Sequence, residues 1–398
     1  MGAFEITNGI YSVGVLNPNL RIFDIIMETQ YGTSYNAYLV KGDKTALIEA
    51  VHTRFFDDYL NNIKEVVDIQ SIDYIVLNHT EPDHSGSLKQ LLEENPNIKV
   101  VTSAPGAKYI KGIVNREINN QVVKDGDVLD LGQGKKLTFM IAPFLHWPDS
   151  MFTYVAQDKV LFSCDFLGCH FCEPRMYDTK ILYPREFEEA FSYYYDVIFG
   201  PFNQYVQEGL DKIQSLEIDY ICPSHGPILT EKIEWAKEQY NAWSKEDKEE
   251  KKAPKVLIAY VSAYGCTRKM ATELEKAIKD SSSAQVEAVD IIHEDMMALK
   301  EKVEKADALL FGSPTINRDA VKPVWDLLSL VDVFKNKGKL CGVFGSYGWS
   351  GEAVGMLCER VRSLKLKVHE DGIKANFVPS EQELAAVYEY GKSFASKL

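Results

Sequence analysis

The sequence has no excess of basic residues, no hydrophobic run long enough to cross a membrane and no cysteine framework. Its 398 residues hold 44 Lys and Arg against 58 Asp and Glu, a formal charge of −14, which argues against a nucleic-acid partner. The beginning, MGAFEITNGIYSVGV, lacks the basic region and apolar core of a signal peptide. Nowhere do about 18 apolar residues follow one another. The seven cysteines are odd in number and scattered, unlike a disulfide framework. We therefore expect a cytoplasmic protein with reduced thiols that binds neither nucleic acid nor membrane.

Two segments of different pattern indicate two domains, at residues 1–250 and 254–398. The charged run SKEDKEEKKAP, from Ser244 to Pro254, separates them and has no apolar periodicity; a solvated helix end would also fit it. After Lys255, apolar runs such as KVLIAYV, VEAVDI, DALLFG and KLCGVFG alternate with stretches of helical spacing, which predicts an α/β domain with a doubly wound parallel sheet. Before the linker, strand-like runs such as LRIFDIIMET, NAYLVKG and KTALIEA lie close together, which predicts an α+β layered sandwich.

The most specific segment is HTEPDH, from His79 to His84, directly after the apolar run YIVLN. His79, Glu81 and Asp83 alternate, so an extended chain would project them to one side. Imidazoles and carboxylates at this density suit a divalent transition metal. A polar loop in which Asp83 or Ser85 caps the next helix is the alternative.

Three further strand-like runs end in a potential metal ligand. LTFMIAPFLHW leads to His146, VLFSCD ends at Asp165, and IDYICPSHG leads to His225. The last run echoes IDYIVLNH, which delivers His79 at the same offset. Each residue alone would more often be structural, but ligands at four strand ends can converge on one site.

Three loops of the C-terminal half predict a bound phosphate and an aromatic ligand. The first, SAYGCTR, stands between an apolar run and a helical stretch, where backbone N–H groups and the helix dipole attract an anion. It lacks the lysine of a Walker motif and the pattern G-x-G-x-x-G, and a plain loop with Thr267 as N-cap remains the alternative. The loops GSPTIN and GSYGWSG follow the third and fourth strand-like runs, at the sheet edge where ligands bind. The candidate residues are Ser262, Tyr264, Gly265, Cys266, Thr267, Ser313, Pro314, Thr315, Asn317, Ser346, Tyr347, Gly348, Trp349 and Gly351.

The N-terminal half resembles the metallo-β-lactamase superfamily, from about Ile10 to Pro227. That superfamily has the motif His-x-His-x-Asp-His, a later His, a bridging Asp and a final His. Glu81 stands where its hydrolases usually have His. An anionic oxygen ligand stabilises higher oxidation states and suits iron better than zinc.

The pattern His-x-Glu-x-Asp-His resembles the flavodiiron proteins, and the C-terminal half resembles flavodoxin, which implies FMN. The resemblance implies an αββα sandwich followed by a flavodoxin-like domain. It further implies that His79, Glu81 and His146 hold one iron, that Asp83, His84 and His225 hold the other, and that Asp165 bridges them; whether His84 always coordinates is left open. No rubredoxin module with two Cys-x-x-Cys pairs follows Leu398, so we expect the short two-domain type.

The same resemblance implies reductive scavenging of NO, O2 or both in an anaerobe, with electrons from a rubredoxin-like donor. It also implies a head-to-tail homodimer, or a dimer of such dimers, in which Trp349 reaches the partner's diiron pocket or only shields the flavin. A hydrolase of the glyoxalase II type with an accessory flavodoxin-like domain is the alternative. A plain electron carrier with a vestigial metal site is a third interpretation.

Several residues near the predicted centre have two interpretations. His170 and Trp147 are expected to contact it indirectly, as is one of Tyr193, Tyr194 and Tyr195, with Tyr195 the first candidate. Packing in the core is the better explanation for at least two of these three tyrosines. The pair Cys169 and Cys172 has no second pair for a zinc ribbon, so we expect structural thiols.

Overall fold

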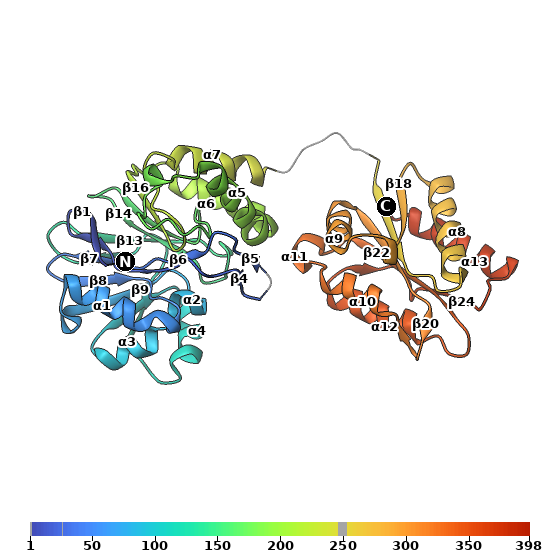
Figure 1. Ribbon diagram of the computed structural model, residues 1–398, viewed down its shortest axis with the longest axis horizontal. Helices are drawn as coiled ribbons and strands as arrows, with labels where there is room; N and C mark the ends of the chain where they lie inside the picture. Colours follow the sequence, from blue (N-terminus) through green and yellow to red (C-terminus); the bar gives the residue numbers. More distant parts are fainter. Residues whose placement is uncertain (1, 26, 246–252) are drawn as a thin grey trace. The chain divides into compact units, whose positions relative to one another are not determined.

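The computed structural model describes residues 2–25, 27–245 and 253–398. The chain divides into two compact units, Met1–Asp247 and Lys248–Leu398 (Figure 1). Most of the charged run from Ser244 to Pro254 lies outside the described residues. Each unit has its own hydrophobic clusters.

Two β-sheets form the middle layers of the first unit. The seven-stranded sheet has the order β1-β2-β7-β8-β9-β10-β11 and the five-stranded sheet the order β12-β13-β14-β15-β16. The strands of the first sheet are β1 (Phe4–Thr7), β2 (Ile10–Ser12), β7 (Tyr38–Lys41), β8 (Thr45–Ile48), β9 (Ile72–Leu77), β10 (Lys99–Thr102) and β11 (Asn120–Val122). Those of the second are β12 (Val128–Asp130), β13 (Lys136–Ile141), β14 (Met151–Val155), β15 (Val160–Cys164) and β16 (Tyr220–Pro223).

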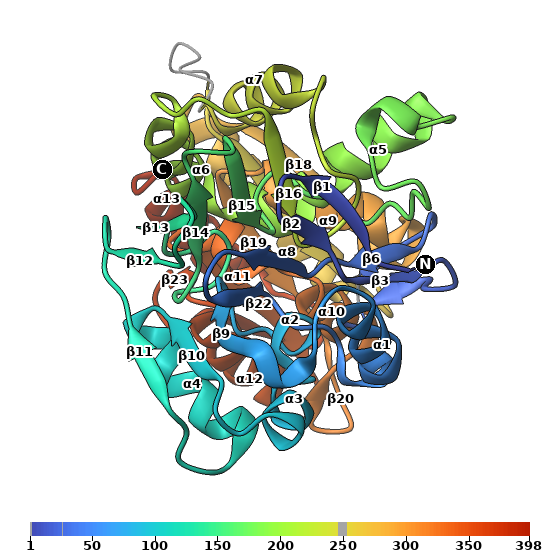
Figure 2. The ribbon, with the colours of Figure 1, turned by 90° about the vertical axis from the view of Figure 1, so that its left-hand side faces the viewer.

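Helices cover the outer face of each sheet (Figures 1 and 2). The first sheet carries α1 (Phe56–Val66), α3 (Leu88–Glu94) and α4 (Ala104–Val114), with the short α2 (Pro82–Ser85) near its edge. The second carries α5 (Pro184–Tyr194), α6 (Asn203–Ile213) and α7 (Ile233–Ser244). Separate apolar clusters fill the layer between the sheets and each helix–sheet layer. This is the predicted αββα sandwich.

Strand direction brings the ligand-bearing loops to one end of the sandwich. β15 and β16 are parallel neighbours, so the loops after them leave the same edge of the sheet. Asn78, the residue after β9, connects the seven-stranded sheet to β14 of the five-stranded sheet. Its O atom accepts from Met151 N at 2.8 Å, and its Oδ1 accepts from Thr153 Oγ1 at 2.6 Å. The loops that carry His79, Asp165 and His225 therefore meet there.

The second unit is the predicted doubly wound parallel sheet. Its order is β18-β17-β19-β22-β23, with β24 also beside β22, and all these pairs are parallel. The strands are β17 (Lys255–Tyr260), β18 (Gln285–Asp290), β19 (Ala308–Gly312), β22 (Leu340–Tyr347), β23 (Lys367–Val368) and β24 (Ile373–Asn376). The helices are α8 (Cys266–Ser281), α9 (Met296–Lys305), α10 (Lys322–Ser329), α11 (Val333–Asn336), α12 (Glu352–Ser363) and α13 (Glu381–Ala395).

One strand-like run differs from the prediction. LRIFDIIMET forms no long strand but a small hairpin of β4 (Ile22–Phe23) and β5 (Met27–Glu28). Asp24 and Ile25 have φ values of 47° and 69°, a left-handed backbone that turns the chain within the apolar run. The remaining short strands are β3 (Val15–Asn17) with β6 (Thr33–Tyr35), and β20 (Thr315–Ile316) with β21 (Asp319–Ala320).

Candidate metal centre and flavin site

The seven predicted ligand residues come together in two groups. One contains His79, Glu81, His146 and Asp165, and the other Asp83, His84 and His225. Within each group the potential ligand atoms lie within 4.8 Å of one another, and every residue except the half-buried His146 is buried. Four strand ends therefore supply one cluster.

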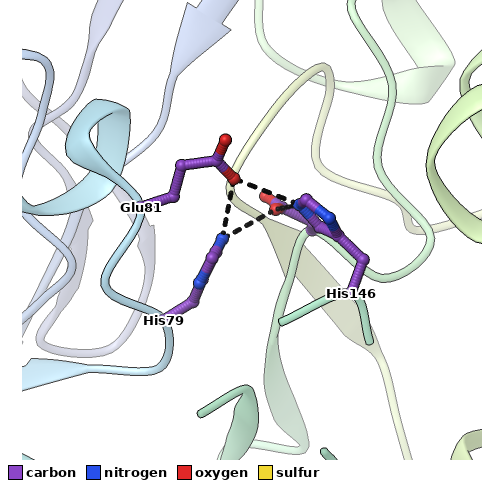
Figure 3. A group of neighbouring side chains, drawn as sticks. His79, Glu81 and His146 are labelled. Carbon is purple, nitrogen blue, oxygen red and sulfur yellow. Dashed lines mark hydrogen bonds and ion pairs between the residues drawn. The ribbon is translucent and has the colours of Figure 1, made fainter. Parts of the chain in front are cut away.

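Glu81 joins the two histidines of the first group (Figure 3). Its Oε2 atom lies 3.0 Å from His79 Nε2 and 3.1 Å from His146 Nε2. These three atoms surround a small common space, the arrangement that a single metal ion would require.

Asp165 lies between the groups and turns one oxygen to each. Its Oδ2 is 3.5 Å from His79 Nε2 and 3.3 Å from His146 Nε2. Its Oδ1 is 3.0 Å from His84 Nε2 and 3.7 Å from His225 Nε2. His225 Nε2 is also 3.0 Å from Asp83 Oδ2. A carboxylate with this orientation can bridge two metal ions.

The segment from His79 to His84 is not extended, contrary to the prediction. Glu81 is the N-cap of α2 and Pro82 occupies its first turn, a position that proline favours. The helical turn rotates Asp83 and His84 away from the direction of His79 and Glu81. As a result, one six-residue segment supplies both groups.

Carboxylates and imidazoles balance one another electrostatically in the cluster. Burial raises the pKa of Glu81, but hydrogen bonds from His146 and His79 outweigh it and leave that pKa below its usual range. The pKa of Asp165 is well below its usual range, because the charge of His84 and the hydrogen bond of His146 outweigh burial. Burial lowers the pKa of His225, but the hydrogen bond and charge of Asp83 have a larger, opposite effect, and the resulting pKa is about 9. Metal ions bind imidazoles in competition with protons, so metal binding at such a cluster depends on pH.

The donor atoms fit a pair of iron ions. Both oxygens of Asp83, both ring nitrogens of His84 and Oδ1 of Asp165 are buried without a hydrogen bond among the described residues. Such atoms are costly unless they bind something. A mixed set of imidazole nitrogens and carboxylate oxygens suits iron.

Asp149 lies beside the Nδ1 atom of His79, on the side of the ring away from Glu81. This residue was not predicted from the sequence. Its Oδ2 accepts from Thr80 N at 2.9 Å and from Thr80 Oγ1 at 2.6 Å, and its Oδ1 lies 3.7 Å from His79 Nδ1. A carboxylate behind a metal-binding imidazole fixes the ring's orientation and tautomer. Only its place three residues after His146 could have pointed to it.

The indirect contacts differ in part from expectation. His170 does lie at the cluster: its Nδ1 is 2.8 Å from Thr33 Oγ1, and its ring is 4.5 Å from the His225 ring. Tyr194, rather than Tyr195, is the neighbouring tyrosine, with its ring 5.0 Å from His170. Tyr195 begins a π-helix (Tyr195–Phe199), and its hydroxyl donates to Asn203 Oδ1 at 2.7 Å.

Cys169 and Cys172 are free thiols. Burial raises the pKa of the Cys172 thiol to about 11 and that of Cys169 further. Thiols that stay protonated are poor nucleophiles and poor metal ligands, which agrees with a structural role.

The second unit has a cavity of about 220 Å³ at the carboxyl ends of its central strands. Its walls come from the three predicted loops and from Phe377, which follows β24. The lining residues are Ala263, Tyr264, Cys266, Thr267, Pro314, Thr315, Ile316, Ser346, Tyr347, Gly348, Trp349 and Phe377. Position and shape match the ligand site of doubly wound sheets.

The N-terminus of α8 opens at this cavity. Its N-cap, Gly265, has a left-handed φ of 81° and no side chain that could cap the helix. Thr267 is therefore inside the first turn and is not the N-cap; its Oγ1 lies 2.8 Å from Ser346 Oγ. Ser262 Oγ accepts from one first-turn N–H group, that of Arg268; the earlier N–H groups of the turn, next to an N-cap without a side chain, suit a phosphate group.

Five predicted flavin residues are not among those that line the cavity, namely Ser262, Gly265, Ser313, Asn317 and Gly351. Ser262 Oγ accepts from Arg268 N at 3.1 Å, and Ser313 Oγ accepts from Val321 N at 3.0 Å. These hydroxyls hold the loop backbones. Ala263, Ile316 and Phe377 line the cavity but were not predicted, because nothing in their residue type singles them out.

The fold and the two sites define a class of protein, in which a β-lactamase-type metal domain precedes a flavodoxin domain. The family described as "ODP family beta lactamase" matches residues 33–226, and the flavodoxin family matches residues 258–391. Among the described residues, no helix is long and apolar enough to cross a bilayer.

Similar proteins narrow this class to one family. The chain is 52% identical to the flavo-diiron protein FprA2 of Clostridium acetobutylicum, over 100% of both chains. It is 34% identical to a nitric oxide reductase of Moorella thermoacetica, over 99% of this chain and 98% of that protein. The solved structure of rubredoxin:oxygen oxidoreductase from Desulfovibrio gigas matches with a TM-score of 0.68 and 29% identity, covering 99% of this chain and 98% of that one.

The chain belongs to the flavo-diiron protein family. It is accordingly an oxidoreductase and a flavoprotein whose cofactors are FMN and a non-haem diiron site, and the donor set and cavity described above fit both.

Proposed function

We propose that the protein reduces nitric oxide to nitrous oxide, dioxygen to water, or both, at a diiron centre that receives electrons from FMN. The observation that carries the proposal is the position of Asp165, whose two oxygens face the two ligand groups. A pair of metal ions held at a fixed separation can bind two NO molecules or one O2 molecule. The names of the Moorella and Desulfovibrio relatives support both gases.

In this proposal His79, Glu81 and His146 bind one iron, Asp83, His84 and His225 bind the other, and Asp165 bridges them. When bound, the two ferrous ions supply two electrons and the reduced flavin two more. Dioxygen needs four electrons to become two waters, whereas two NO molecules need two to become N2O and water. The chain's own part is to hold the ligand atoms in place, with Asp149 fixing the ring of His79.

The flavin lies, in this proposal, with its phosphate at the N-terminus of α8 and its ring in the cavity beside Tyr347, Trp349 and Phe377. Tyr264 and Trp349 are 94% and 86% exposed, so the ring's edge would be open to a redox partner. We propose a rubredoxin-like protein as electron donor, which the name of the Desulfovibrio enzyme supports. We further propose a head-to-tail homodimer, or a dimer of dimers, in which the flavin of one chain serves the metal centre of the other.

A hydrolase of the glyoxalase II type is not favoured. Glu81 supplies an anionic ligand where those hydrolases usually have His, and the similarity to flavo-diiron proteins extends over the entire chain. A plain electron carrier would not need seven potential ligand residues in two adjoining groups, six of them buried.

The test is anaerobic turnover of the purified protein with each gas, after its iron and FMN have been quantified. Consumption of NO or O2 that requires both cofactors is expected. Thioesterase activity in a protein that contains only zinc, without gas consumption, would reject the proposal.

A further inference from the structure

Trp147 lies against both histidines of the first metal group. Its ring centroid is 5.0 Å from that of His79, at an interplanar angle of 64°, and 6.5 Å from that of His146, at 79°. Edge contacts of this kind are favourable packing. They also place an oxidisable indole beside two ligands of one metal ion.

Tyr109 continues this path to solvent. Its ring centroid is 6.4 Å from that of Trp147, at 83°, and 38% of the residue is exposed. Tyr109 belongs to α4 and Trp147 to the loop after β13. Two aromatic rings, each in contact range of the next, thus connect the metal group with the surface.

The other aromatic residues at the cluster cannot serve in the same way. Phe199 has an edge contact with His146 at 6.2 Å, but a phenyl ring is hard to oxidise. The ring centroid of Tyr194 lies 6.2 Å from that of His225. However, Tyr194 is only 1% exposed, and burial raises its pKa well above the usual value. Tyr35, whose ring is 5.9 Å from that of His225, is buried as well, at 3% exposed. A tyrosine gives up an electron readily only when its proton can leave, and the side chain of Tyr109 reaches the surface.

Buried thiols near the centre would be damaged if oxidising equivalents stayed there. Cys164 directly precedes Asp165, and Cys169 follows it by four residues; both are 1% exposed. Oxidation of a buried thiol to sulfinic or sulfonic acid is irreversible for most proteins.

We propose that Trp147 and Tyr109 form an electron route from the protein surface to the metal centre, used when O2 reacts there and the flavin cannot deliver enough electrons. This inference rests on the proposed function. In each passage Trp147 gives one electron to the centre and is restored by Tyr109, which releases its hydroxyl proton to water and becomes a neutral radical. A small thiol in solution then returns one electron and one proton to Tyr109, and two such thiols join as a disulfide. Two passages supply the two electrons that a ferrous pair lacks for reducing O2 to water.

The test uses full-length protein loaded anaerobically with ferrous iron, with oxidised FMN and no electron donor. The protein is mixed with O2 and frozen rapidly, and iron oxidation is followed by absorbance and radicals by electron paramagnetic resonance. We expect a tyrosyl radical in the wild type that is lost in Tyr109→Phe and in Trp147→Phe. The matched control is Tyr183→Phe, at a 63% exposed tyrosine of the same unit, which should retain the radical.

Peptide mass spectrometry gives the second readout. Over repeated cycles with O2 and a small thiol, Tyr109→Phe should raise oxidation of Cys164 and Cys169 several-fold over wild type, whereas turnover with ample donor stays unchanged. An unchanged radical yield in Tyr109→Phe, or unchanged thiol oxidation, would overturn the inference even though the irons are oxidised. If O2 does not oxidise the ferrous irons at all, the proposed function itself fails.

Discussion

Glu81 lies with one carboxylate oxygen between two imidazole nitrogens, 3.0 Å from His79 and 3.1 Å from His146. Hydrogen bonds from both rings keep its pKa low, so it is an anion in the cluster. An anionic oxygen at this position is the residue-scale feature that distinguishes an iron-preferring site from the hydrolase pattern. We therefore propose that the metal preference of the first group depends on Glu81.

The substitution Glu81→His should move the centre towards zinc. It replaces the anion with a neutral nitrogen ligand, and zinc outcompetes ferrous iron at such donors. We expect the zinc-to-iron ratio to rise and gas reduction to be lost, with unchanged FMN content because the second unit has its own core. Metal analysis and gas consumption of the two purified proteins measure this. Undiminished turnover of NO and O2 by the variant would show that Glu81 is not decisive.

The substitution Asp149→Asn should weaken iron binding without removing a proposed ligand. Asparagine keeps the size of the side chain and a hydrogen bond to Thr80, but it no longer holds His79 by charge. Loss of such a supporting carboxylate typically costs about 10- to 100-fold in metal affinity or activity. Iron release to a chelator, compared with that of wild type, checks the effect, and an equal release rate would assign Asp149 to the fold alone.

Residue type and position after strand-like runs singled out all seven residues that the structure brings together in the two groups; that they bind metal stays a prediction. The supporting residues were not predictable in the same way. Thr33 comes from β6, 137 residues before its partner His170, and such long-range contacts leave no local pattern. Tyr194 and Tyr195 are neighbours of the same type, and only the π-helix decides which of them reaches the cluster.

At the scale of elements, both sites sit where strands end and a short helix begins. Pro82 starts α2 and divides the metal motif between the two groups. Gly265 is the N-cap of α8, where it has a φ of 81° and no side chain to cap the helix. A residue with a Cβ atom adopts this left-handed backbone only at a cost.

The substitution Gly265→Ala should destabilise the second unit and weaken its hold on FMN. The added Cβ meets no other atom within 4 Å, so the penalty is the backbone strain alone, about 1 kcal/mol. Gly355→Ala is the control: it lies within α12, its Cβ also meets nothing, and alanine there should stabilise by up to about 1 kcal/mol. In calorimetry, the unfolding temperature of the second unit should fall in Gly265→Ala and rise in Gly355→Ala, and FMN release should be faster in Gly265→Ala. Unfolding temperatures that shift in the same direction in both variants would contradict this explanation.

Apolar runs predicted several strands of each unit, among them β7, β8, β17 and β22, but the prediction failed where backbone conformation overrides the apolar pattern. LRIFDIIMET has the composition of a strand, yet two left-handed residues fold it into a hairpin. The extended geometry expected for the metal motif is absent because proline at a first helical turn outweighs alternation. Neither conformation has a signature in hydrophobicity.

At the scale of the whole molecule, the metal ligands belong to one compact unit and the flavin cavity to the other. Electron transfer weakens steeply with distance, so the two cofactors must come close during turnover. The exposed Tyr264 and Trp349 beside the flavin cavity suit contact with a second chain. The head-to-tail pairing proposed above would provide it.

Mixing two inactive variants tests this pairing. One lacks metal ligands (His79→Ala with His146→Ala), and the other, Thr267→Asp, places a negative charge at the proposed phosphate position. If electrons cross between chains, each heterodimer holds one intact pair of cofactors out of two, and gas reduction should return, up to about a quarter of wild type in a fully mixed sample, where about half of the dimers are heterodimers. A mixture that stays inactive, although heterodimers are shown to form, would mean that transfer occurs within one chain.

The proposed pair of iron ions bridged by Asp165 can be tested by Mössbauer spectroscopy of the purified protein in an applied magnetic field. Two ferric ions that share a carboxylate bridge couple antiferromagnetically. We predict about two irons per chain with a diamagnetic ground state, and an electron paramagnetic resonance signal that appears only after one-electron reduction. Magnetically isolated iron ions, in protein with full metal occupancy, would contradict the claim.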